Sequence, residues 1–153
     1  QNTLQQRTMR STSRIYLELV SRLKALSEDE LEYLVECAES EVPIMLWVAL
    51  CRRYAFMRDF AADVLREHRL NLKISLDQTE FDVFFNAQMS EHEELSTISL
   101  ATKQKARQIL FLTLREVRLV TSYGELNQIV PNAATLRVIS PHELDAIGFV
   151  TRV

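Results

Sequence analysis

The stretch Val42-Pro43-Ile44-Met45-Leu46-Trp47-Val48-Ala49-Leu50 is the most apolar part of the chain and decides its fold class. Pro43 suits the first turn of a helix, where its missing N–H would have no partner in any case. The residues after it are apolar all round, which is typical of a helix packed on several sides. The stretch is less than half of the roughly 20 residues that span a bilayer. It therefore predicts a buried central helix.

Helix-start signals lie on both sides of this stretch. Ser27 and Glu30 have the spacing of a capping box, and Asp77 with Glu80 repeats it. Serine and aspartate caps also precede other runs of apolar residues at helical spacing. The predicted helices are 11–26 from Ser11-Thr12-Ser13, 27–40 from Ser27, 59–70 from Asp59, a helix from Asp77 that buries Phe81, Phe84 and Phe85, and 99–118 from Ser99. Residues 90–97 are predicted to form a solvated connection.

The pattern changes after Val120. β-branched residues recur at 129–130 and 135–139, and the sequence Pro131-Asn132-Ala133-Ala134 between them favours a hairpin connection. Ser140-Pro141-His142-Glu143 then predicts a short last helix that ends at Gly148. We therefore expect a mainly α, compact multi-helix bundle with a small C-terminal β-hairpin, winged-helix-like in outline. Residues 1–97 would form a helical domain, and residues 98–153 would pack against it as one unit.

Composition restricts the class of protein. The chain has 153 residues, of which 47% are hydrophobic and 25% charged, as in ordinary globular domains. Only two glycines occur, so a glycine-rich phosphate-binding loop is excluded. Cys37 and Cys51 are expected to be reduced, because no secretory feature accompanies them. We expect a cytoplasmic protein without a membrane span.

A search for reactive groups finds no catalytic or metal site. His68, His92 and His142 have no cysteine within four residues, and no His-Glu-x-x-His or Cys-x-x-Cys motif occurs. His68 is predicted to lie on a solvated helix face. No Gly-x-Ser-x-Gly nucleophile motif is present either. We therefore expect a binding protein that is not an enzyme and has no cofactor, metal or small-molecule substrate.

Charge is strongly segregated along the chain. The net charge is −3, but residues 1–24 carry an excess of four positive charges and residues 98–119 another four. Residues 52–76 carry an excess of three, and the segments between these blocks are acidic. Such blocks can build a basic face on an acidic protein. They are equally typical of helices whose charges serve solubility and surface ion pairing.

The basic clusters are the candidate binding residues. Nucleic-acid binding needs lysine and arginine side chains on a rigid scaffold, because neutralising phosphates releases condensed counterions. A helix N-terminus adds backbone N–H donors, which suits the turn after Ser99. The predicted nucleic-acid-binding residues are Arg7, Arg10, Arg14, Arg52, Arg53, Thr102, Lys103, Lys105 and Arg107. A base-stacking role for Phe81, Phe84 and Phe85 is the alternative to core packing of these rings.

The order of these features resembles a known family. A basic, serine-rich helix start (10–14) leads to Leu46-Trp47-Val48-Ala49-Leu50-Cys51, and then to the stretch from Phe60 to His68. The long helix with residues 102–110 and the close Ile139-Ser140-Pro141-His142-Glu143-Leu144 follow. Together they resemble the BrxA family of bacterial BREX (bacteriophage exclusion) systems, over about residues 10–149.

This resemblance implies a helical protein with a winged-helix-like part, related in architecture to the antitermination factor NusB. It also implies double-stranded DNA binding within a multi-protein defence system, with other BREX proteins as partners. Two alternatives stay open from the residues. One is a protein-interaction adaptor that docks a partner through its acidic or aromatic surfaces. The other is an RNA-binding, NusB-like module.

Overall fold

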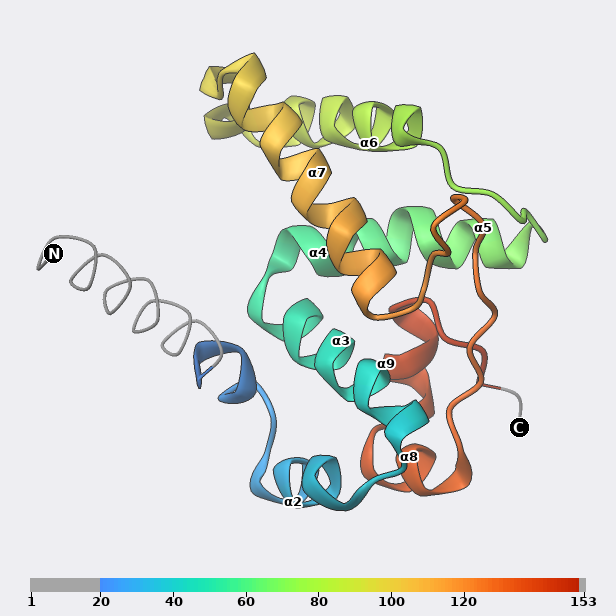
Figure 1. Cartoon of the computed structure of the whole chain (residues 1–153). Helices are drawn as coiled ribbons and strands as arrows, with labels where there is room; N and C mark the ends of the chain where they lie inside the picture. Colours follow the sequence, from blue (N-terminus) through green and yellow to red (C-terminus); the bar gives the residue numbers. More distant parts are fainter. Residues whose placement is uncertain (1–19, 152–153) are drawn as a thin grey trace, which may run out of the picture.

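The computed structural model describes residues 20–151, and within them the chain is built from helices (Figure 1). Residues 20–23 are helical. The elements that follow are α2 (Glu28–Glu36), η1 (Glu39–Glu41), α3 (Val42–Arg53), α4 (Ala55–Phe60), the π-helical η2 (Ala61–Arg66), α5 (Glu67–Leu70), α6 (Gln78–Glu91), η3 (Glu93–Thr97), α7 (Leu100–Glu116), α8 (Ala133–Val138) and α9 (Pro141–Ala146).

Helix α3 is the centre of the core, as its sequence predicts. Pro43 lies in its first turn, and all residues from Ile44 to Cys51 except Leu46 are buried. The indole Nε1 of Trp47 donates a hydrogen bond of 3.0 Å to the carbonyl of Ile147. A buried Trp N–H needs such an acceptor, and this bond ties α3 to the end of α9.

Three of the predicted caps are confirmed. Ser27 and Glu30 form a reciprocal capping box at the start of α2, and Asp77 with Glu80 does the same for α6. The hydroxyl of Ser99 accepts the backbone N–H of Thr102 at the start of α7. Helix α2 ends at Glu36 and not at Ser40, because the chain turns into η1 before entering α3. Residues 11–19 of the first predicted helix lie outside the described residues.

The predicted cap at Asp59 is wrong. The helix begins at Ala55 after the extended residue Tyr54, and it continues through η2 and α5 to Leu70. Asp59 therefore lies inside the helix. Phe60, Val64 and Leu65 of this continuous helix are buried.

His68 also differs from its predicted solvated position. It is buried, and its Nε2 lies 2.7 Å from Glu80 Oε1 of α6. Helix α6 packs close by through its aromatic residues. The ring of Phe56 makes edge contacts with the rings of Phe81, Phe84 and Phe85. These rings form core and leave no stacking platform, because all three α6 phenylalanines are buried.

The predicted C-terminal β-hairpin, and with it the winged-helix-like outline, is wrong. Within residues 20–151 no β-strand occurs, only the isolated bridges Ser75–Glu125 and Val120–Leu126. Asn132, expected in a hairpin connection, is instead the N-cap of α8, and its side chain accepts the N–H of Thr135 at 2.9 Å.

The physical reason for α8 lies across the fold. Thr135 is fully buried, and its hydroxyl donates a 2.6 Å hydrogen bond to Oε2 of the buried Glu41. The same carboxylate oxygen accepts the backbone N–H of Asn132 at 3.1 Å. These long-range bonds favour the helical turn over the extended form that β-branched residues prefer. Figure 1 shows α8 beside α2 at one end of the molecule, with the α6 and α7 pair at the other.

Candidate nucleic-acid interface

Arg52 is an internal clamp. Its Nη1 donates to Glu30 Oε2 at 2.6 Å and to the carbonyl of Ala25 at 3.0 Å, while Nε donates to Glu143 Oε1 at 2.6 Å. The hydrogen bond from Arg52 holds the pKa of the Glu30 carboxyl below its ordinary value, against the opposing effect of burial. Carboxylates therefore accept hydrogen bonds from both N–H edges of the Arg52 guanidinium group. Arg52 joins α2, α3 and α9 and is closed to a phosphate.

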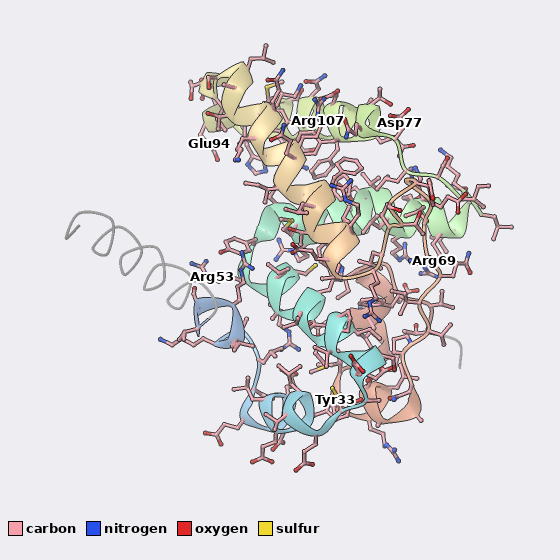
Figure 2. All side chains as sticks on the ribbon, in the orientation of Figure 1. Tyr33, Arg53, Arg69, Asp77, Glu94 and Arg107 are labelled. Carbon is pink, nitrogen blue, oxygen red and sulfur yellow. The ribbon has the colours of Figure 1, made fainter. Side chains whose placement is uncertain are left out.

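Arg53, the next residue, is exposed. Its Nε donates a 2.8 Å hydrogen bond to the hydroxyl of Ser21, and its guanidinium lies 5.1 Å from the ring centroid of Tyr54. Among the described residues no carboxylate forms an ion pair with Arg53. The charge of Arg53 is therefore available at the surface (Figure 2). The neighbouring segment is basic in sequence, but Arg7, Arg10 and Arg14 lie outside the described residues.

Lys103 and Arg107 lie on the side of α7 that faces α6, where they share one acid. Lys103 Nζ is 3.5 Å from Asp82 Oδ1, and Arg107 Nη1 is 3.4 Å from Asp82 Oδ2. Lys103 also lies 5.2 Å from the ring centroid of Phe85, so its charge contacts the aromatic core of α6. Together the three residues carry one net positive charge. Their positions are explained by packing of α6 against α7.

Thr102 and Lys105 complete the predicted set. Thr102 belongs to the cap of α7: its N–H is bound to Ser99 Oγ, and the two hydroxyls lie 2.9 Å apart. Lys105 is exposed, and the described residues include no ion-pair partner for it. Figure 2 shows Arg53 and Arg107 well apart, at the end of α3 and in the upper half of α7. The fold thus brings Lys103 and Arg107 together on Asp82 and keeps Arg107 apart from Arg53.

Other exposed cations were not singled out in the sequence. Lys24, Lys73, Arg115, Arg118 and Arg137 are exposed and have no ion pair within residues 20–151. Arg66 and Arg69, in contrast, both bind Asp145 of α9. Arg115 lies in the last turn of α7 and Arg118 just beyond its end, where the helix dipole favours positive charge. Position at a helix end was the signal that could have identified these two.

An apolar groove lies between α3 and α7. It has a volume of about 310 Å³. Its lining is mostly apolar and consists of Leu23, Leu46, Ala49, Leu50 and Val117 with Thr113, Arg22 and Glu116. On α7 the side chain of Ile109 is 47% exposed, and that of Leu112 is 50% exposed. They lie one helical turn before Thr113 and Glu116, which line the groove. We call the groove together with these two residues the α3–α7 groove.

Residues 20–151 also bear on metal binding and on membrane insertion. No group of three or more His, Cys, Asp and Glu side chains there is arranged to hold a metal ion. Nor does that part of the chain contain a helix with the length and apolar character required to cross a bilayer. Cys37 and Cys51 are free thiols, and burial raises the pKa of Cys51 well above its ordinary value.

Comparison with known protein families gives a match. No curated protein matches the chain. The model of the BrxA family matches residues 1–143, which is nearly the whole sequence. This match confirms the resemblance read from the helix patterns, and it implies a role associated with BREX phage-defence systems, with other BREX proteins as partners. The chain belongs to the BrxA family.

Proposed function

We propose that this protein is a non-enzymatic component of a BREX system that binds double-stranded DNA in the cytoplasm. The observation that carries the proposal is the exposed Arg53, bound to Ser21 and free of carboxylate partners among the described residues. Ser21 belongs to the basic segment 1–24 and lies seven residues after Arg14 in the sequence. Arg53 is therefore an exposed cation bound to a residue of one of the two most basic segments of the sequence.

The contribution of the other predicted residues differs with their partners. Lys105 has no partner in the described part of the chain and is a phosphate ligand in this proposal. Lys103 and Arg107 contribute only their long-range field, because Asp82 offsets part of their charge. Arg52 has no part in the interface. Phosphate contacts of this kind favour affinity without sequence preference.

Fluorescence anisotropy with a labelled 20-base-pair duplex tests the proposal. If about six cations contact phosphates, the slope of log K against log salt is about −5. The triple variant with Arg7, Arg10 and Arg14 changed to glutamate should lose most of the affinity. Arg137→Glu on α8 is the control for a single charge reversal elsewhere on the surface, since Arg137 is exposed and unpaired among the described residues. No binding at 50 mM salt, or a flat salt dependence, contradicts DNA binding.

The same assay separates the RNA alternative. Single-stranded RNA that displaces the duplex at equal or lower concentration favours an RNA-binding module. A protein-interaction adaptor is the second candidate function, and the exposed α3–α7 groove favours it specifically. An adaptor retains partner binding when the basic residues are reversed, and it shows no nucleic-acid affinity.

A further inference from the structure

The α3–α7 groove has the shape and composition of a helix-binding site. Leu46 of α3 is 39% exposed, and Ile109 and Leu112 of α7 are each about half exposed. Isolated exposed aliphatic residues are normal on a protein surface. Leu46 instead lines an apolar groove of about 310 Å³, and Ile109 and Leu112 lie one helical turn before Thr113 and Glu116, which also line it. Contiguous apolar patches with polar edges are typical of interaction sites.

The dimensions of the groove fit a short helix. Leu46 and Arg53 are seven residues apart on α3, as are Ile109 and Glu116 on α7. At 1.5 Å per residue each wall is about 10 Å long, or two helical turns. Residues of α3, of α7 and of the helical segment 20–23 line the groove, and one more helix would complete a bundle. Amphipathic helices bind such grooves through apolar residues at positions i, i+3 or i+4, and i+7.

The charges around the groove select the partner. Arg53 lies one turn beyond Ala49 on the same face of α3, and Lys105 one turn before Ile109 on the same face of α7. Neither has an ion-pair partner among the described residues, whereas Glu116 is the carboxylate that lines the groove. The flanks therefore carry an excess of positive charge. A second copy placed face to face would bring these like charges together, which disfavours self-association.

We propose that the α3–α7 groove binds an amphipathic helix of another protein, with an apolar stripe flanked by glutamate or aspartate. The stripe packs on Leu46, Ile109 and Leu112, and the acidic flanks bind Arg53 and Lys105. This interaction is separate from DNA binding, although it uses two of the same cations. The acidic helix and duplex DNA therefore compete for the protein.

A pair of designed peptides tests this inference with the full chain. Both have 14 residues and leucine at positions 3, 7, 10 and 14, and they carry either glutamate or lysine at the flanking positions. The glutamate peptide should show saturable binding below roughly 100 µM by fluorescence anisotropy. The lysine peptide should bind at least about tenfold more weakly. Equal affinity of the two peptides overturns the charge selection, and no binding of either overturns the site.

Surface variants locate the binding. The double variant Ile109→Ser, Leu112→Ser removes two exposed contacts and should weaken the glutamate peptide at least about tenfold. Val83→Ser on α6 is the control, because Val83 is also exposed but does not line the groove. Circular dichroism checks that both variants fold.

Two further results overturn the inference. One is unchanged peptide affinity in the double variant. The other is a concentration-dependent sedimentation coefficient of the unmodified chain that the double variant abolishes, since this would assign the groove to a second copy. The DNA assay is independent of this result. The double variant keeps every basic residue, so it should give the same result with duplex DNA as the unmodified chain, and failure of the proposed DNA binding is distinguishable from failure of this inference.

Discussion

The end of α3 and the first half of α7 carry similar basic sequences, but the fold uses them differently. At the end of α3, two adjacent arginines lie in different environments. Arg52 binds Glu30 and Glu143 inside the molecule, and Arg53 is exposed at the surface. On α7, Lys103 and Arg107 share Asp82 while Lys105 between them is exposed. The comparison shows that the partner across the fold, and not the local density of charge, decides what a cation does.

The largest expected effect is on the internal clamp. Arg52→Ala should reduce the free energy of unfolding by about 3 kcal/mol, because it leaves two carboxylates partly buried without a counter-charge. Arg53→Ala should change it by less than about 0.5 kcal/mol. Urea unfolding followed by circular dichroism measures both. Similar losses of unfolding free energy in the two variants would contradict the assignment of Arg52 as an internal clamp and of Arg53 as a surface cation.

Acid sensitivity sharpens the same distinction. Hydrogen bonding from Arg52 lowers the folded-state pKa of Glu30, and Asp145 is lowered too, since bonds from Arg66 and Arg69 outweigh the effect of burial. A lowered folded pKa contributes stability above the unfolded pKa, and this stability is lost as pH falls through the folded value. Urea midpoints from pH 7 to pH 3 should therefore fall less steeply in Glu30→Gln than in the unmodified protein. Glu32→Gln, on the exposed side of α2, is the control.

Charge reversal tests the two exposed cations, Arg53 beside Arg52 and Lys105 between Lys103 and Arg107. Lys105→Glu and Arg53→Glu should each weaken duplex DNA binding by roughly tenfold at 100 mM salt and make the salt slope shallower by about one. Stability should be unchanged within about 0.5 kcal/mol. If Lys103→Glu proves more damaging to DNA binding than Lys105→Glu, the pairing with Asp82 does not decide availability.

The smallest expected effect is a gain in affinity for duplex DNA. Asp82→Asn removes the acid shared by Lys103 and Arg107, so both cations become available to phosphates. Duplex affinity should rise about two- to threefold at 100 mM salt, with a loss of stability below about 1 kcal/mol. Asp59→Asn, which frees Arg58 from a neighbour on the same helix, is the matched control. Unchanged affinity in Asp82→Asn would indicate that this face of α7 does not contact DNA.

The predictable parts of the fold were those with local causes. The capping boxes at Ser27 and Asp77 need only a serine or aspartate with glutamate three residues on, and they appear as predicted. The prediction of a C-terminal hairpin failed because it rested on the β-propensity of Thr135, Val138 and Ile139 alone. The cap at Asp59 failed because the continuous helix starts four residues earlier, without any side-chain cap.

The candidate site was less predictable than the fold. Glu30 and Glu143, the partners of Arg52, lie 22 and 91 residues away in sequence, and Asp82 lies 25 residues from Arg107. No local pattern connects such pairs. The burial of His68 has the same cause, since Glu80 lies on a different helix.

The amino-acid sequence by itself determined that the chain is helical, where most of its helices begin, which of them is central and to which family it belongs. These properties follow from hydrophobic spacing and from hydrogen bonds between residues three or four apart. Only the tertiary structure decided which cations are neutralised, where the α3–α7 groove opens and that α8 is a helix. Each of those outcomes depends on contacts between segments distant in sequence, whose energies exist only after the helices have packed.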